Sequence, residues 1–361
     1  MPGTLGRALR GLAHPLYKSL ESRARVLRYL FIEITQRCNL ECLHCGSDCG
    51  RDAQLPELST DEWVAFFRYL GEHFDRRELL PVVTGGEPFC CPDFDRVLGA
   101  LRESGFAWGL VSNGWALNPA NVDKVLAHGL QSLTVSLDGL EGSHDWLRNK
   151  RGSFERTRAG IRTAVAADLP FFDIVTCVNP RNLRELPEVL ALLRSLGVKM
   201  WRLFTIFPKG RAKTNEQLRL NEEQLRELFA WIAKARRELD GEDFLLQYSC
   251  EGYLPSAVDR QVRDQPYFCR AGINIASVLC DGSISACPNI ARDLIQGNVR
   301  TDDFKTVWEE GFDRYRDRAW MKTGACTHCS QWSKCQGNSM HLWDAEKQQT
   351  MICHDHVLRG C

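Results

Sequence analysis

Short apolar runs alternate with longer amphipathic segments over the first two thirds of the chain. The runs hold five to eight residues and are rich in β-branched and aromatic side chains, which is typical of buried strands. They are LFIEIT (30–35), LPVVT (80–84), AWGLVS (107–112), SLTVSLD (132–138), FFDIVTCV (171–178) and MWRLFTIF (200–207). The segments between them predict helices.

The clearest predicted helix covers residues 59–74. Its aromatic and leucine side chains, including Trp63 and Phe67, recur every three or four residues and form one apolar face. Ser59, with Glu62 three residues later, has the pattern of an N-terminal capping box. The other predicted helices cover residues 93–105, 119–129, 153–168, 182–197 and 221–239.

Six alternations of strand and helix predict a parallel sheet with right-handed crossovers. A closed barrel of this type needs about eight such units, so we expect an α/β fold with a partial (β/α)6 TIM-type barrel. Ligands of such sheets bind at the carboxyl ends of the strands. Residues that directly follow the strands are therefore the first candidates for a functional site.

Composition narrows the class of protein. The 361 residues include 46 basic and 46 acidic side chains, so no basic surface predicts a nucleic acid partner. No apolar run approaches the roughly 20 residues of a membrane-spanning helix. The N-terminal residues are basic but contain no apolar core typical of a secretory signal. We therefore expect a cytoplasmic protein.

The chain contains 16 cysteines, and they are unevenly distributed. Four lie between residues 38 and 49, and nine lie from residue 250 onward. Clustered thiols in an intracellular enzyme are typical of metal sites. We expect an N-terminal helical extension (1–28), a barrel (29–240) and a small cysteine-rich domain (241–361). The extension is helix-permissive, and we expect it to cover the open mouth of the barrel rather than bind a membrane.

The first cysteine cluster directly follows the first predicted strand. Cys38, Cys42 and Cys45 have the spacing C-x3-C-x2-C. Three thiolates can hold a cubane iron–sulfur cluster and leave one iron open to a small molecule, whereas structural zinc needs four ligands. A zinc knuckle completed by Cys49 or His44 remains the alternative on this loop alone.

Polar and glycine residues follow the next three strands. TGGEP (84–88) follows the second strand, SNG (112–114) the third and SLDG (136–139) the fourth. The glycines allow close approach of the backbone to a ligand. The polar side chains can bind amine, carboxylate and ribose groups. These side chains belong to Glu87, Ser112, Asn113, Ser136 and Asp138.

In this order, the motifs resemble the radical S-adenosylmethionine (SAM) superfamily over about residues 28 to 210. The resemblance implies a [4Fe–4S] cluster on Cys38, Cys42 and Cys45, whose open iron binds SAM. One electron then cleaves the sulfonium to give a 5′-deoxyadenosyl radical. The implied SAM-binding residues are His44 near the adenine, Gly85, Gly86 and Glu87 at the methionine amine, and Ser112, Asn113, Ser136 and Asp138. Cys49, Cys90 and Cys91 lie outside the motif and are expected to pack.

The C-terminal cysteines resemble the SPASM extension, which carries auxiliary iron–sulfur clusters in many radical SAM enzymes. Paired C-x2-C units are also typical of zinc ribbons. The resemblance implies a distal auxiliary [4Fe–4S] cluster on Cys326, Cys329, Cys335 and Cys353. It also implies that Cys269 and Cys287 bind a proximal cluster.

One position departs from the SPASM pattern. The cysteine expected near the end of the C-x2-C-x5-C-x3-C motif is replaced by Ser339, in CQGNSMHLWD. A proximal cluster must therefore recruit Cys250 or Cys280, leave an iron open, or be absent. We expect Cys250 to be the helper and predict one or two auxiliary clusters.

The resemblance implies a radical SAM oxidoreductase that modifies a peptide or protein side chain, for example by crosslinking or oxidation. An enzyme of the same architecture acting on a haem precursor or small molecule is the alternative. A non-catalytic zinc-binding interaction protein is a remote alternative. An external one-electron donor of the flavodoxin or ferredoxin type is expected.

Overall fold

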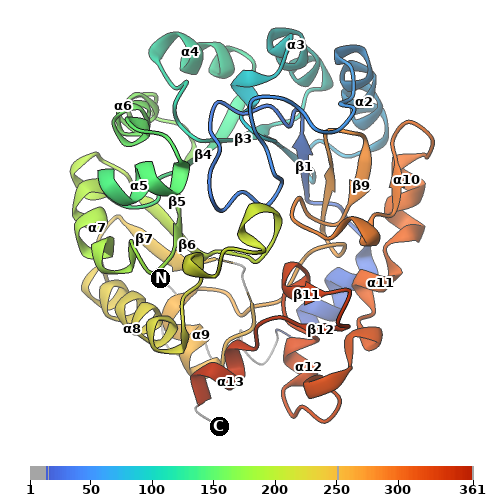
Figure 1. Ribbon diagram of the computed structural model, residues 1–361. Helices are drawn as coiled ribbons and strands as arrows, with labels where there is room; N and C mark the ends of the chain where they lie inside the picture. Colours follow the sequence, from blue (N-terminus) through green and yellow to red (C-terminus); the bar gives the residue numbers. More distant parts are fainter. Residues whose placement is uncertain (1–13, 15, 250–251, 360–361) are drawn as a thin grey trace.

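The computed structural model describes residue 14, residues 16–249 and residues 252–359. Cys250, the expected helper of a proximal cluster, lies outside these described residues. Figure 1 shows a ring of strands with helices outside it and the C-terminal region closing one side of the ring.

The barrel wall consists of seven consecutive parallel strands in chain order. They are β1 (Tyr29–Glu33), β2 (Leu80–Thr84), β3 (Trp108–Ser112), β4 (Leu130–Ser136), β5 (Phe171–Val178), β6 (Met200–Thr205) and β7 (Leu245–Tyr248). The first six are the six predicted strands. The partial barrel is confirmed, and β7 pairs with β6 as an additional strand that the sequence did not predict.

Helices cover the outside of the wall and bury one face each against it. They are α2 (Thr60–His73), α3 (Phe94–Ser104), α4 (Pro119–Ala127), α5 (Glu141–Arg148), α6 (Ser153–Ala166), α7 (Leu186–Ser195) and α8 (Glu222–Glu238). Trp63 and Phe67 of α2 are fully buried, and Ser59 and Glu62 form the predicted capping box. The short helix α5 was not predicted.

The C-terminal region enters the same sheet. Strand β8 (Ile275–Val278) pairs parallel to β1, and Tyr29 lies opposite Ile275. β9 (Ser283–Ser285) pairs antiparallel to β8, and β10 (Gly297–Asn298) pairs antiparallel to β9 at the edge of the sheet. β1 is therefore a central strand, flanked by β2 on one side and β8 on the other.

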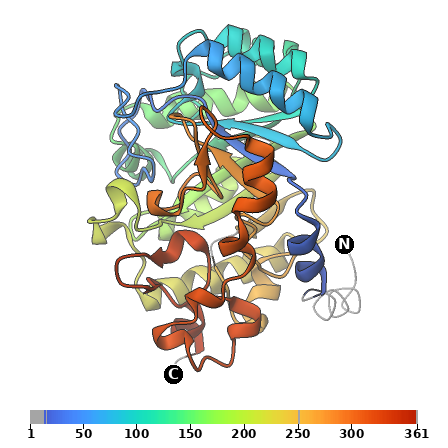
Figure 2. The ribbon, with the colours of Figure 1, turned by 90° about the vertical axis from the view of Figure 1, so that its right-hand side faces the viewer.

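The remaining C-terminal elements are short. They are α9 (Ser256–Val262), α10 (Phe304–Thr306), α11 (Asp313–Arg316), α12 (Trp332–Cys335), α13 (His354–Arg359) and the two-stranded sheet of β11 (Trp343–Asp344) and β12 (Gln349–Thr350). Figure 2 shows them stacked below the barrel helices α2 and α3. Loops carry most of the C-terminal cysteines.

The described part of the N-terminal extension is helical over residues 16–24, but it does not cover the barrel mouth. Glu21 accepts hydrogen bonds from Arg28 and Asn274, which precede β1 and β8. Trp308 Nε1 donates to the backbone oxygen of Arg25 at 2.6 Å. This helix therefore packs where β1 and β8 begin, opposite the carboxyl ends of the strands. The expectation of a helix across the mouth was wrong for these residues.

None of the helices within the described residues combines the length and apolar character that crossing a bilayer requires.

Candidate active site at the strand ends

The first cysteine loop follows β1, and its two ends are held together by hydrogen bonds. Its two ends meet at a bridge between Arg37 and Gly50, and Cys38 N donates to Gly50 O at 2.6 Å. The side chain of Gln36 binds Ser47 O inside the loop and accepts from Gln54 N beyond it. The loop therefore starts from a fixed base, which limits where the three cysteines can lie.

The two glycines of TGGEP bring the backbone after β2 against the start of this loop. Gly86 N donates to Thr35 O at 2.8 Å, and Glu87 N donates to Arg37 O at 2.9 Å. A Cβ atom on Gly85 would lie 2.3 Å from Thr35 O, and one on Gly86 would lie 2.3 Å from Arg37 O. The close approach that the sequence predicted is thus, at least in part, to the protein's own backbone.

Each of the three cysteine sulfur atoms accepts a hydrogen bond. Cys38 Sγ accepts from Leu40 N at 3.4 Å, Cys42 Sγ from an Arg148 nitrogen at 3.7 Å, and Cys45 Sγ from Cys49 N at 3.3 Å. Donors directed at sulfur stabilise thiolates, the form in which cysteine binds metal. The loop therefore fits a thiolate-held cluster.

The thiols differ in acidity. Burial raises the pKa of Cys38 to about 12 and also raises that of Cys42. A hydrogen bond from the Cys49 thiol, which outweighs burial, lowers the pKa of Cys45 to about 6. Cys49 is itself buried against Cys38, Cys42 and Leu40, as expected of a packing residue.

Glu87 lies beneath the loop and is 1% exposed. Its carboxylate accepts from Ser112 Oγ at 2.9 Å and from Asn113 N at 2.8 Å. Burial raises its pKa to about 7, against these two hydrogen bonds. The structure thus brings Glu87, Ser112 and Asn113 together. The side-chain amide of Asn113 also donates to Asn39 Oδ1 at 2.8 Å.

A buried ion pair lies behind Cys42. Arg148, the last residue of α5, places one nitrogen 2.6 Å from Asp138 Oδ2 and another on Cys42 Sγ. Burial alone would raise the pKa of Asp138, but Arg148, His44 and His144 lower it overall. Asp138 also accepts from Cys177 N at 2.8 Å and has no exposed surface. Its predicted contact with SAM stays a prediction.

Sequence reasoning missed Arg148. Its helix, α5, has eight residues and only two large apolar side chains, Trp146 and Leu147, so the helical period is weak. The one local signal was the polar run after SLDG, which ends in DWLR.

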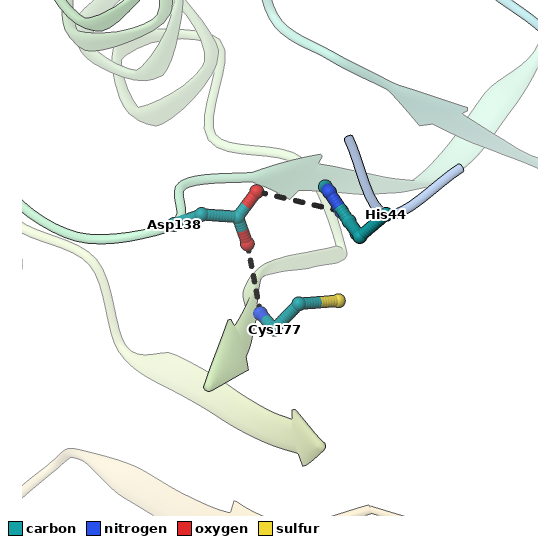
Figure 3. Close-up of side chains that lie close together, drawn as sticks. All are labelled: His44, Asp138 and Cys177. Atoms are coloured by element: carbon teal, nitrogen blue, oxygen red, sulfur yellow. Dashed lines mark hydrogen bonds and ion pairs between the residues drawn. The ribbon is translucent and has the colours of Figure 1, made fainter. Parts of the chain in front are cut away.

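His44 and Cys177 each lie beside a different carboxylate oxygen of Asp138 (Figure 3). His44 Nε2 lies 3.8 Å from Asp138 Oδ2, and burial lowers the pKa of His44 to about 4, so its ring is neutral at pH 7. Ligand atoms of these three residues lie within 4.8 Å of one another. A single cation there would compete with Arg148, which already holds the carboxylate. Ser136 ends β4 nearby and is half-buried.

The segment after β6 connects the cysteine loop to the C-terminal region. Arg211 binds Cys42 O through its side chain at 2.8 Å and Cys45 O through its backbone N–H at 3.0 Å. Lys209 Nζ donates to Trp343 O at 3.2 Å. Figure 1 shows this yellow-green segment beside the blue cysteine loop over the centre of the ring.

The four cysteines predicted for a distal cluster come together. Cys326 lies within electrostatic range of Cys329 and Cys353, and Cys335 lies within range of all three. The four thiols are therefore grouped in one place, as the ligands of one metal site would be.

Cys269 and Cys287 both lie within electrostatic range of Tyr315, whose pKa is raised by burial and by both thiols. The Arg318 guanidinium and the Met340 N–H both bind the Cys269 sulfur, and they lower its pKa although burial opposes this. Cys280 lies beside the segment that precedes α2, where Leu58 N donates to Cys280 O at 2.6 Å. Burial, Glu33 and Asp281 raise the pKa of the Cys280 thiol to about 12.

Comparison with known proteins gives the same assignment. A model of the radical SAM superfamily matches residues 32–193, and a model of the SPASM iron–sulfur cluster-binding domain matches residues 269–330. The chain is 29% identical over 327 residues to the AdoMet-dependent heme synthase of Methanosarcina barkeri, covering 86% of this chain and 90% of that protein. It is 29% identical over 318 residues to the mycofactocin maturase MftC of Mycolicibacterium smegmatis, covering 85% and 76%.

A solved structure agrees on the fold. SuiB of Streptococcus suis, bound to S-adenosylmethionine, superposes with a TM-score of 0.65 at 16% identity, covering 86% of this chain and 72% of SuiB. These matches exclude the zinc-binding interaction protein. The chain carries a radical SAM domain and a SPASM iron–sulfur cluster-binding domain, and is an enzyme whose cofactors are SAM and [4Fe–4S] clusters.

Proposed function

We propose that the chain is a radical SAM oxidoreductase that modifies a peptide or protein side chain. Cys38, Cys42 and Cys45 would hold the cluster that binds SAM, because each sulfur accepts a hydrogen bond at the carboxyl end of β1. When bound, this cluster and SAM supply a 5′-deoxyadenosyl radical, which removes a hydrogen atom from the substrate.

One observation supports a substrate site formed jointly by the cysteine loop and the C-terminal region. Residues 207–212 contact both the cysteine loop, through Arg211, and the C-terminal region, through Lys209. Phe207 also packs against His341, with ring centroids 4.2 Å apart and the ring planes tilted by 37°. This segment supports a substrate position at the barrel mouth, between the two cysteine regions.

The residues around SAM have distinct proposed roles. Glu87 would accept from the methionine ammonium, and it holds Asn113 in place through the backbone. The glycines let TGGEP lie against the loop base. His44 would offer a neutral ring to the adenine. Ser112, Ser136 and Asp138 complete the proposed set, with Asp138 acting through Arg148.

Cys326, Cys329, Cys335 and Cys353 are proposed as the ligands of a complete distal auxiliary cluster, since their four thiols come together. Such clusters accept or donate single electrons over a wide range of potentials. A flavodoxin- or ferredoxin-type donor would supply the electron that initiates turnover. We keep 1–28, 29–240 and 241–361 as the functional division, although β7 and β8 join the barrel sheet.

The peptide assignment is supported by the similarity to the mycofactocin maturase over 85% of the chain. A haem-type substrate is the second candidate, because the alignment to the heme synthase covers 90% of that protein. Mass analysis of the products distinguishes a peptide substrate from a haem-type substrate.

The test uses reconstituted full-length protein with SAM and a strong reductant. 5′-Deoxyadenosine is measured after addition of either a candidate peptide or an iron porphyrin, and each substrate is examined by mass spectrometry. A mass change in the peptide with stimulated 5′-deoxyadenosine formation supports the first class. A mass change in the porphyrin alone supports the second and overturns the peptide proposal.

A further inference from the structure

Arg318 is a buried cation without a carboxylate partner among the described residues. It is 4% exposed. Its nitrogens donate to Tyr315 O at 3.1 Å, Asn338 O at 3.1 Å and Cys269 O at 3.2 Å. The guanidinium also donates to the Cys269 sulfur. Backbone oxygens satisfy its hydrogen bonds, but they do not neutralise its charge.

A second cation faces the same place. Lys18, from the helix of residues 16–24, lies within electrostatic range of Arg318, Cys269 and Cys335. Buried charges are normally paired or bound to a metal centre, because an isolated one loses its hydration. Two cations around Cys269 therefore indicate that an anionic group belongs there.

Ser339 lies next to this position. It is fully buried, and its hydroxyl has no hydrogen-bond partner. The residue before it accepts from Arg318 through Asn338 O, and the residue after it donates to the Cys269 sulfur through Met340 N. Ser339 is thus bracketed by two contacts to the same arginine–cysteine pair. A buried hydroxyl without a partner calls for a physical reason, such as an ion or group that it binds.

We propose that Ser339 Oγ is an iron ligand of a proximal auxiliary [4Fe–4S] cluster that Cys269 and Cys287 also hold, with Arg318 as its buried counter-charge. This rests on the proposed ligand roles of Cys269 and Cys287. On binding, the O–H bond breaks, an Fe–O bond forms, and the proton leaves to solvent. Arg318 and Lys18 offset the negative charge of the alkoxide and thiolates. The serine replaces the missing thiolate in the SPASM pattern.

An oxygen ligand gives the cluster a distinct signature. Alkoxide is harder than thiolate and favours ferric iron. The proximal cluster should therefore have a lower midpoint potential than the same cluster carrying a fourth thiolate. Ser339→Cys should raise that potential while leaving the iron content unchanged.

The experiment uses the full chain with Cys38, Cys42 and Cys45 replaced by Ala, so that only auxiliary clusters contribute to the spectra. Iron and sulfide per chain, the EPR spectrum of the reduced protein and midpoint potentials are measured after anaerobic reconstitution. Ser339→Ala should lose about four irons per chain, or keep them with a changed EPR signal from one cluster. Ser277→Ala is the matched control, because Ser277 on β8 is also a fully buried serine whose hydroxyl has no hydrogen-bond partner. It should change neither.

Three results separate the possibilities. A Ser339→Ala protein that matches its parent in iron, EPR and potential overturns the ligand role of Ser339. If Cys269→Ala/Cys287→Ala also leaves iron unchanged, the underlying ligand assignment fails as well. If that double variant loses iron while Ser339→Ala does not, only the inference about Ser339 fails. Circular dichroism of the iron-free variants identifies any variant that does not fold. If Ser339→Ala does not fold, the midpoint potential of Ser339→Cys decides the question, because an unchanged potential would also overturn the ligand role of Ser339.

Discussion

Arg148 and Arg318 are both buried guanidinium groups beside a cysteine sulfur, but their surroundings differ in charge. Arg148 is paired with Asp138 at 2.6 Å, and Cys42 is an additional neighbour. Arg318 has backbone oxygens and Cys269, with no acidic side chain bound to it among the described residues. Asp138 therefore balances the charge of Arg148, whereas no carboxylate among the described residues balances that of Arg318.

This difference bears on how the two sites respond to loss of their metal. A balanced ion pair keeps its geometry whether or not a cluster is present. An unbalanced cation is stabilised mainly when the anionic cluster is bound, so folding and metal binding are coupled there. We therefore expect the iron-free SPASM region to be the weaker part of the protein.

The largest expected effect is the complete loss of SAM cleavage when the cysteines of the barrel loop are removed, with the C-terminal clusters left in place. Replacing Cys38, Cys42 and Cys45 by Ala should abolish 5′-deoxyadenosine formation and remove about four irons per chain, while the C-terminal iron stays. Chromatography of the reaction products and iron analysis check this. Retained SAM cleavage would show that the initiating cluster lies elsewhere.

Removing each arginine tests the comparison directly. Arg148→Met leaves Asp138 buried without its partner and should lower the free energy of unfolding by about 3–5 kcal/mol, with or without iron. Arg318→Met should destabilise the cluster-loaded protein more than the iron-free protein. Denaturant unfolding of both forms measures this. Adding Asp138→Asn to Arg148→Met should restore much of the loss, and equal behaviour of the two arginine variants would refute the contrast.

A third prediction concerns a buried acid near the barrel loop. Burial raises the pKa of Glu33 to about 7, so the folded protein keeps a proton that the unfolded chain releases near pH 4.5. The contribution of Glu33 to the stability of the iron-free protein should therefore be fully present below about pH 4.5 and be lost as the pH rises through 7. Glu33→Gln should remove up to roughly 3 kcal/mol of this loss.

Urea unfolding at pH 5 and pH 8 measures the change for Glu33→Gln. The exposed Glu41→Gln in the same region is the control and should keep the slope of the parent. An unchanged pH dependence in Glu33→Gln would mean that this carboxyl titrates normally.

The smallest expected effect is on SAM affinity. Glu87→Ala removes a proposed acceptor for the ammonium, and a charge-assisted hydrogen bond contributes about 1.5–3 kcal/mol. SAM binding should weaken roughly 10- to 100-fold at unchanged iron content, measured by equilibrium binding. Glu103→Ala removes an exposed carboxylate on α3, outside the site, and is the control that should leave SAM affinity unchanged. Parallel loss of iron would instead make Glu87 structural, as its bonds to Ser112 and Asn113 allow.

The sequence predicted the six strands well because each is a short contiguous run rich in apolar and β-branched residues, with buried positions that alternate with half-buried ones in strands such as β2 and β6. It did not predict β7 and β8, which have four residues each and are identified as strands only by their pairing with β6 and β1. The cysteine loop and TGGEP could be placed from spacing alone.

Contacts between distant segments could not be predicted in this way. Arg148 reaches Cys42 across 106 positions, and Arg211 reaches the same residue across 169. No periodicity encodes such a pair, so both arginines were missed. The same holds for Arg318, which is 49 residues from Cys269.

The central position of β1 has a consequence for synthesis of the protein. One edge of β1 pairs with β2. The other edge stays unpaired until β8, whose first residue is Ile275, has been synthesised. At translation rates of roughly 5–20 residues per second, that edge stays open for about 10–50 s after β1 emerges. An open strand edge invites pairing with other chains. Nascent chains should therefore aggregate most readily before residue 275 is made, and slowing translation upstream of that point should lower the yield of folded protein.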